Sequence, residues 1–109
     1  MAYYRIRVEI TTLLSDEEYG AFKALVAENP SAGVLIRGGG GIRKVRLGAG
    51  ARGKRGGARV IYYWAVREHV ILMLYEYLKS EAADLTPKQA ARLAKVVKEE
   101  FRDESEDVQ

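Results

Sequence analysis

The chain contains no cysteine and a single histidine, His69, among its 109 residues. The lack of cysteine excludes disulfides, thiolate metal sites and cysteine nucleophiles. One histidine alone argues against most metal centres and against a Ser/His catalytic triad. These absences remove the commonest hydrolytic mechanisms, and we expect neither a metal nor a small-molecule cofactor.

Long apolar runs are missing as well. Hydrophobic residues make up 48% of the chain, yet no run approaches the roughly 20 residues that span a bilayer. The opening MAYYRIRVEI alternates and carries charge, where a signal peptide would have an unbroken apolar segment. We therefore expect a single cytoplasmic domain over residues 1–109, with no membrane partner.

Acidic residues are absent from the middle of the chain. No Asp or Glu occurs between Val34 and Val66, whereas eight cations fall there: Arg37, Arg43, Lys44, Arg46, Arg52, Lys54, Arg55 and Arg59. Acidic residues crowd instead into the C-terminal tail, which we expect to be flexible from about residue 102. Although the net charge is only +3, the middle of the chain is therefore electropositive and suits the binding of a polyanion.

Two capping boxes mark the predicted helices. Ser15 and Glu18 have the required spacing, and a helix is predicted over 16–28. Thr86 and Gln89 form the second box, ahead of a C-terminal helix. The apolar stripe of that helix is Ala90, Leu93, Ala94, Val97 and Phe101.

Alternation with a period of two predicts the strands. One strand is predicted over 4–12 and another over 42–47, and the runs 59–66 and 70–75 indicate an antiparallel hairpin that turns at His69. The predicted fold class is α+β. It comprises an antiparallel sheet of about four strands, an N-terminal helix or helical hairpin, and a C-terminal helix.

The basic, glycine-rich loop contains two motifs that look like phosphate-binding sites. Gly48, Gly50 and Gly53 satisfy G-x-G-x-x-G, and residues 48–54 satisfy the first part of a P-loop. Both motifs need a helix directly after the glycines, but Arg55-Gly56-Gly57 and a strand follow. We interpret the loop as a flexible surface segment with solvated cations and not as a nucleotide site. A further interpretation is that its flexibility and charge serve to bind a polyanion.

The side chains that suit RNA cleavage lie around the predicted hairpin. Cleavage through the 2′-OH needs proton transfer and stabilisation of negative charge at phosphorus, for which lysine and arginine serve. Strand parity predicts that one face carries Ile71, Met73, Tyr75, Tyr77 and Lys79. Because antiparallel neighbours run in opposite directions, Arg59 should lie beside Tyr77 and Lys79.

Three motifs occur in a fixed order: G-G-x-R-K-x-R at 40–46, G-K-R-G-G-x-R-V-I-Y-Y at 53–63 and Y-x-K-x-E at 77–81. Together they resemble the HigB branch of the RelE/ParE toxin superfamily, over roughly residues 38–101. The resemblance implies a RelE-like fold and a metal-independent, ribosome-dependent mRNA endonuclease. It also implies a partner antitoxin with a helix-turn-helix domain.

The resemblance further implies a role for each basic residue. Arg59 would stabilise the scissile phosphate, Lys79 would serve in acid–base chemistry or charge stabilisation, and Tyr77 would stack on or orient the nucleotide. Lys54 would hold the RNA backbone beside these catalytic residues. The residues expected to bind mRNA and the 16S rRNA of the ribosome are Arg43, Lys44, Arg46, Arg52 and Arg55.

Alternatives stay open for the residues and for the function. Arg59 and Lys79 also fit solvated strand-end charges. Core packing would equally account for the aromatic residues of the hairpin, Tyr62, Tyr63, Trp64 and Tyr75. At the level of function, a toxin of the same fold could inhibit DNA gyrase by binding, and a non-catalytic RNA-binding protein could use the same basic loop.

Overall fold

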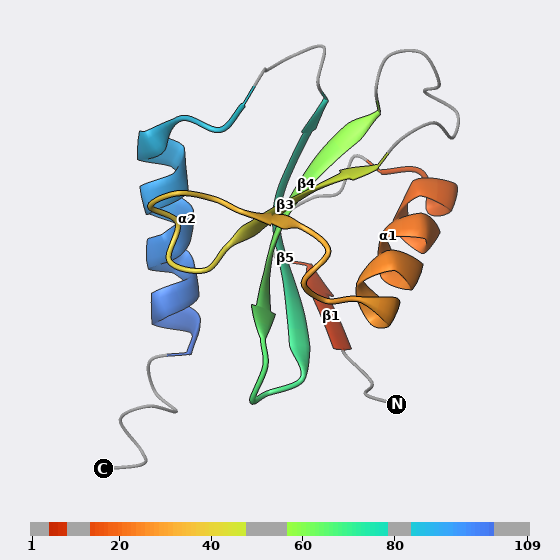
Figure 1. Cartoon of the computed structure of the whole chain (residues 1–109), viewed down its shortest axis with the longest axis horizontal. Coiled ribbons are helices and arrows are strands. Elements are labelled where there is room, and N and C mark those ends of the chain that lie inside the picture. Colours follow the sequence, from red (N-terminus) through yellow and green to blue (C-terminus); the bar gives the residue numbers. More distant parts are fainter. Residues whose placement is uncertain (1–4, 9–13, 48–56, 79–83, 102–109) are drawn as a thin grey trace.

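The computed structural model describes residues 5–8, 14–47, 57–78 and 84–101, which form one sheet flanked by two helices. The strands are β1 (Arg5–Val8), β2 (Val34–Leu35), β3 (Arg43–Leu47), β4 (Ala58–Ala65) and β5 (Val70–Leu78). The helices are α1 (Asp16–Glu28) and α2 (Pro87–Glu100). Figure 1 shows them on opposite sides of the sheet, so the fold has three layers.

The sheet has the strand order β1-β5-β4-β3-β2. Strands β2 to β5 pair antiparallel in chain order, while β1 joins the edge parallel to β5. The predicted α+β class, with about four antiparallel strands and a helix at each end of the chain, is confirmed. Within the described residues the N-terminal element is one helix and not a hairpin. The predicted strand over 4–12 is described only at 5–8.

Helix α1 has the predicted bounds because both hydrogen bonds of the predicted capping box form at its first turn. The Ser15 Oγ accepts a hydrogen bond from the Glu18 N–H at 3.1 Å, and Glu18 Oε1 accepts one from the Ser15 N–H at 3.0 Å. Phe22 and Val26 then face the sheet and are fully buried. The helix thereby covers one side of the sheet.

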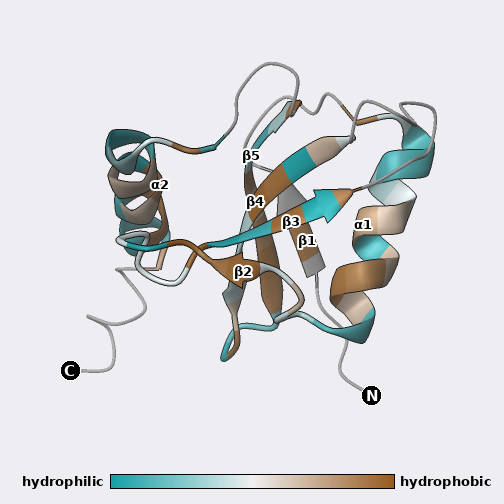
Figure 2. Cartoon of the chain, turned by 45° about the horizontal axis from the view of Figure 1, so that its top comes forward, coloured by the Kyte–Doolittle hydropathy of each residue, from teal (hydrophilic) through white to brown (hydrophobic). Residues whose placement is uncertain are grey.

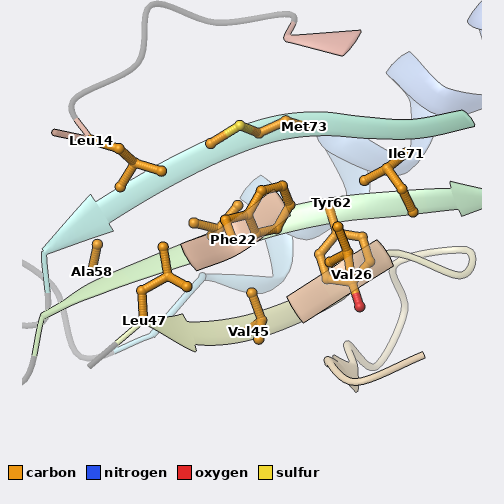
Figure 3. Packing of buried hydrophobic residues seen from close by; sticks show 10 residues of the cluster. Leu14, Phe22, Val26, Val45, Leu47, Ala58, Tyr62, Ile71 and Met73 are labelled. Atoms are coloured by element: carbon orange, nitrogen blue, oxygen red, sulfur yellow. The ribbon is translucent and has the colours of Figure 1, made fainter. Parts of the chain in front are cut away.

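Each side of the sheet has its own apolar cluster. The cluster on the α1 side (Figure 3) contains Leu14, Phe22, Val26, Val45, Leu47, Ala58, Val60, Tyr62, Ile71 and Met73. The cluster on the α2 side contains Ile42, Ile61, Leu72, Leu74, Tyr77 and Val97, with Tyr75, Leu85, Leu93 and Phe101 packed against it. We call these sides the α1 face and the α2 face. Figure 2 shows hydrophobic ribbon concentrated in β4 and β5, the two central strands.

A bulge in β5 corrects the predicted parity of this strand. Ile61 pairs with Tyr75 but the next residue of β4, Tyr62, pairs with Met73, so Leu74 is the extra residue. Met73 therefore faces α1, whereas Leu74 and Tyr75 both belong to the α2 face. The predicted single face, from Ile71 to Tyr77, is wrong because the bulge reverses the alternation half-way along the strand.

A buried tyrosine, Tyr62, holds the segment after α1 against the sheet. The Tyr62 hydroxyl donates to the Pro30 carbonyl at 2.7 Å and accepts from the Gly33 N–H at 2.9 Å, which ties the segment after α1 to β4. Tyr62 is thus a core residue, as the core-packing alternative predicted.

The turn between β2 and β3 depends on glycine. Gly38, Gly40 and Gly41 have positive φ values that residues with side chains rarely adopt. None of the described helices is long and apolar enough to cross a bilayer.

Candidate functional site

Three side chains form a row across the α2 face at one end of the sheet. Arg46 of β3 pairs with Arg59 of β4, and Arg59 pairs with Tyr77 of β5. Directly paired side chains on one face lie about 5 Å apart at Cβ. Since like charges opposite each other destabilise a sheet, the Arg46–Arg59 pair is an arrangement that an anion would stabilise. The predicted neighbourhood of Arg59 and Tyr77 is confirmed.

A second row lies one step further along the same face. Lys44 of β3 pairs with Ile61, which pairs with Tyr75. The rings of Tyr75 and Tyr77 lie 6.0 Å apart between centroids, tilted by 34°. The two rows together bring three cations and two tyrosines onto one face, which we call the cationic face: Lys44, Arg46, Arg59, Tyr75 and Tyr77.

Tyr77 is the most buried member of the cationic face. Its exposed fraction is 5%, and its hydroxyl has no hydrogen-bond partner among the described residues. Burial raises the pKa of Tyr77, and the charges of Lys44 and Arg59 partly oppose that rise. The phenol therefore stays protonated at neutral pH and retains a hydrogen to donate. So little of the ring is exposed that the predicted stacking of Tyr77 on a base does not fit this geometry.

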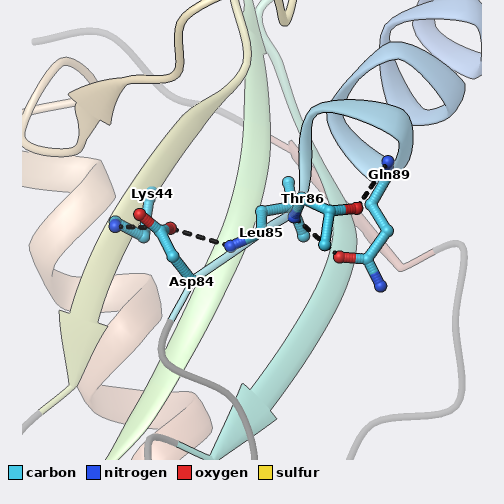
Figure 4. A network of polar contacts seen from close by, with 5 residues as sticks. All are labelled: Lys44, Asp84, Leu85, Thr86 and Gln89. Atoms are coloured by element: carbon cyan, nitrogen blue, oxygen red, sulfur yellow. Dashed lines mark hydrogen bonds and ion pairs between the residues drawn. The ribbon is translucent and has the colours of Figure 1, made fainter.

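An ion pair ties the segment before α2 to the cationic face (Figure 4). Lys44 Nζ lies 3.0 Å from Asp84 Oδ1, which also accepts a hydrogen bond from the Leu85 N–H at 2.8 Å. The hydrogen bond from Lys44 is the main cause that lowers the pKa of Asp84, so the carboxylate is charged at neutral pH. This pair holds the entry to α2 beside β3.

The first turn of α2 is fixed by the predicted second capping box. Thr86 Oγ1 accepts from the Gln89 N–H at 3.1 Å, and Gln89 Oε1 accepts from the Thr86 N–H at 2.9 Å (Figure 4). Pro87 occupies the first helical position, where its missing N–H costs nothing. The side chains at the start of α2 therefore have defined positions next to Asp84 and Tyr75.

Residues 15–109 match the family described as the RelE toxin of the RelE/RelB toxin–antitoxin system. The chain belongs to the RelE toxin family. Among solved structures it resembles the free state of a double arginine-to-alanine mutant of the Escherichia coli toxin RelE. The two share 19% identity with a TM-score of 0.53, and the match covers 76% of this chain and 90% of that one. At this identity the likeness shows the fold alone.

In this RelE-family toxin, Arg43 does not join the cationic face. Alternation along β3 turns its side chain to the α1 face, where the guanidinium donates to the Gly33 carbonyl at 2.8 Å and to the Ser31 carbonyl at 3.3 Å. The predicted grouping of Arg43 with Lys44 and Arg46 on one surface is therefore wrong. Arg43 supports the loop between α1 and β2 instead.

The remaining predicted residues of the RelE-family site lie outside the described residues. They are Arg52, Lys54 and Arg55 in the segment between β3 and β4, and Lys79 in the segment between β5 and α2. Both segments connect to the described chain at Leu47, Gly57 and Leu78, at the end of the sheet where the row of Arg46, Arg59 and Tyr77 lies. Their roles stay predictions.

One feature of the RelE-family site was missed from the sequence. Asp84 contacts Lys44 across 40 positions of the chain, and no local pattern indicates such a pair. Tyr75 shares a face with Tyr77, as strand parity predicted, because both residues lie on the same side of the bulge at Leu74. The described residues contain no group of three or more His, Asp or Glu side chains that could hold a metal ion.

Proposed function

We propose that this RelE-family toxin is a ribosome-dependent mRNA endonuclease of the HigB type. Residues 1–109 would act as one domain that is inhibited by an antitoxin with a helix-turn-helix domain. The observation that carries the proposal is the row of Arg46, Arg59 and Tyr77, with Lys44 beside it. Two guanidinium groups and a buried phenol on one face suit a phosphodiester under attack.

The reaction needs three kinds of help from these side chains. The 2′-oxygen attacks phosphorus and the bond to the 5′-oxygen breaks, which leaves a 2′,3′-cyclic phosphate and a 5′-hydroxyl. Arg59 would stabilise the negative charge that grows on the phosphoryl oxygens. Lys54 and Lys79 are the candidates that remove the 2′-proton and protonate the leaving 5′-oxygen, without a metal. One lysine gains a proton and the other loses one, and exchange of one proton with water restores the starting protonation of both.

Tyr77 takes a different role from stacking. Its protonated hydroxyl has no partner among the described residues and lies beside Arg59. Because this hydroxyl is buried, RNA binding would have to uncover it before it donates a hydrogen bond to a phosphoryl oxygen as charge develops there. The ribosomal RNA and the flanking mRNA would be bound by Lys44 and Arg46, together with Arg52 and Arg55.

Primer extension on an mRNA incubated with purified ribosomes tests this proposal. The variants are wild type, Arg59→Ala, Lys79→Ala and the matched control Arg67→Ala, which removes an exposed arginine from the turn between β4 and β5. We expect new mRNA ends with wild type and Arg67→Ala, strongly reduced ends with the other two, and none without ribosomes. Intact mRNA with wild type would contradict the proposal and would direct the next assay to DNA gyrase supercoiling.

A further inference from the structure

A cavity of about 280 Å³ lies between β5 and the first turns of α2. Its walls are Tyr75, Leu85, Gln89, Arg92 and Leu93. Tyr75, Leu85 and Leu93 are half-buried, whereas Gln89 and Arg92 are exposed at the rim. The volume lies just below the range of about 300–1,000 Å³ that holds drug-sized ligands. It therefore suits a single planar ring system with a few polar atoms.

The polar groups of this cavity are mainly donors. The capping box uses Gln89 Oε1 to accept from the Thr86 N–H, so the amide NH2 is the part of Gln89 that remains for a ligand. Arg92 has only donors. The aromatic ring of Tyr75 and the two leucines supply apolar walls, which a bare phosphate would not occupy. A flat ligand with an apolar face and acceptors along its edge fits both features.

The cavity adjoins the cationic face through Tyr75. Tyr75 and Tyr77 lie on the same face, and two residues of strand span about 6.6 Å. Since Tyr77 pairs directly with Arg59, a phosphate held at Arg59 would lie about one nucleotide from the cavity. The ligand that carries a planar, acceptor-bearing ring at that distance from a phosphate is the adjoining nucleotide of the same RNA strand.

We propose that this cavity binds the base of one nucleotide next to the cleaved phosphate and selects bases by their keto groups. The inference rests on the proposed function and adds a substrate preference to it. Guanine offers O6 and N7 as acceptors, and uracil offers O4 as thymine does. Adenine and cytosine present an amino group at the corresponding edge, which would face the donors of Gln89 and Arg92. The toxin therefore prefers guanine or uracil at this position.

Two variants test the selection without removing the fold. Gln89→Glu keeps the capping box, because glutamate serves at that position as well, but it replaces the NH2 donor with an acceptor. Arg92→Met removes the rim cation, and Lys88→Met on the same exposed turn is the matched control for loss of one charge. The readout is the base frequency at each position around the cleavage sites, obtained by sequencing the cut ends of a mixed mRNA pool.

We expect wild type and Lys88→Met to favour guanine and uracil by about tenfold at one position next to the cut. Arg92→Met should weaken that preference, and Gln89→Glu should shift it toward adenine and cytosine. A purely structural role of Gln89 would lower the rate without changing base frequencies. Identical base frequencies in wild type, Arg92→Met and Gln89→Glu would overturn the inference while leaving the nuclease in place.

Binding measurements separate this inference from the nuclease activity. Short 2′-O-methyl oligoribonucleotides cannot be cut through the 2′-oxygen, so their affinity for the whole chain is independent of cleavage. Tighter binding of guanine- and uracil-containing oligomers, lost in Arg92→Met, would support the base site even if wild type cut no mRNA. Equal affinity for all four bases would overturn it.

Discussion

The Tyr77 side chain combines deep burial with a hydroxyl that no described residue engages. A buried polar group without a partner costs stability, and such a group is retained where it serves the reaction. We expect Tyr77→Phe to reduce mRNA cleavage by about 100-fold, as loss of one donor to a developing charge does. The free energy of unfolding should stay equal or rise by about 1 kcal/mol. Single-turnover cleavage and urea unfolding measure the two effects.

The pH dependence of stability gives the control for this variant. Because burial raises the pKa of Tyr77, the native state holds the phenolic proton more tightly than the unfolded chain, whose tyrosines ionise near pH 10. The preference of the native state for the phenolic proton leaves the free energy of unfolding unchanged below about pH 10. Above that pH the unfolded chain releases the proton first, so the free energy of unfolding falls until the pH has passed the native pKa. Wild type should therefore lose stability more steeply than Tyr77→Phe above about pH 10. Parallel alkaline curves and unchanged cleavage would show that the hydroxyl has neither role.

Asp84 offers a second test at the level of single residues. Its carboxylate neutralises Lys44, so Asp84→Asn should expose one more cation to RNA and steepen the salt dependence of binding by about 0.7 in log–log slope. The Asp84 side chain is 66% exposed, so the pair contributes at most about 1 kcal/mol. That contribution exists above pH 4 or so and is lost as the pH falls through the lowered pKa of Asp84.

Fluorescence anisotropy with a 2′-O-methyl RNA at several salt concentrations measures the slope for Asp84→Asn. Glu99→Gln, which removes an exposed acid from α2, is the matched control and should leave the slope unchanged. Weaker RNA binding by Asp84→Asn would mean that the aspartate positions Lys44 for RNA instead of competing with it.

Individual residues of the site differ in how far the sequence could place them. Arg59 and Tyr77 were placed correctly because antiparallel pairing alone brings the start of one strand to the end of the next. Lys44 and Asp84 could not be paired, since their contact depends on how α2 docks onto the sheet. Tyr75 was placed correctly on one face with Tyr77, whereas Ile71 and Met73 were not, since they lie beyond a bulge that no glycine or proline marks.

Among the elements, the helices were the most predictable. The capping boxes fix the start of α1 and α2 through side chains within four residues, so the local sequence holds the information. The two-residue strand β2 was not predicted, because Val34 and Leu35 are exposed and show no alternation. The parallel pairing of β1 with β5 was not predicted either, since it is a tertiary contact.

The cap of α2 can be tested directly. Thr86→Ala removes the acceptor for the Gln89 N–H and should lower the free energy of unfolding by about 1 kcal/mol. Thr86→Ser keeps the hydroxyl and should stay within about 0.5 kcal/mol of wild type. Urea unfolding measures both variants. Equal loss in the two would assign the effect to the threonine methyl group and not to the cap.

At the scale of the whole molecule, the two faces of the sheet carry different side chains. The α1 face is closed by α1 and by the links of Tyr62 and Arg43 to the loop after it. The α2 face packs against α2 through Leu93 and Val97, and it also carries Lys44, Arg46 and Arg59. Among the described cations of this stretch, Arg43 lies on the α1 face whereas Lys44, Arg46 and Arg59 lie on the α2 face, so they do not form one surface, although the sequence suggested one.

Arg43 and Arg46, three residues apart on β3, test this division of the molecule. Arg46→Gln removes a cation from the α2 face and should make the salt dependence of RNA binding shallower by about 0.7, with the free energy of unfolding within about 0.5 kcal/mol of wild type. Arg43→Gln removes the donors to the Gly33 and Ser31 carbonyls, so it should lower that free energy by about 1 kcal/mol and leave the slope unchanged. Each variant is the control for the other, since both lose one charge from the same strand. If both changed the slope equally, RNA would contact both faces and the cationic face would not be the binding site.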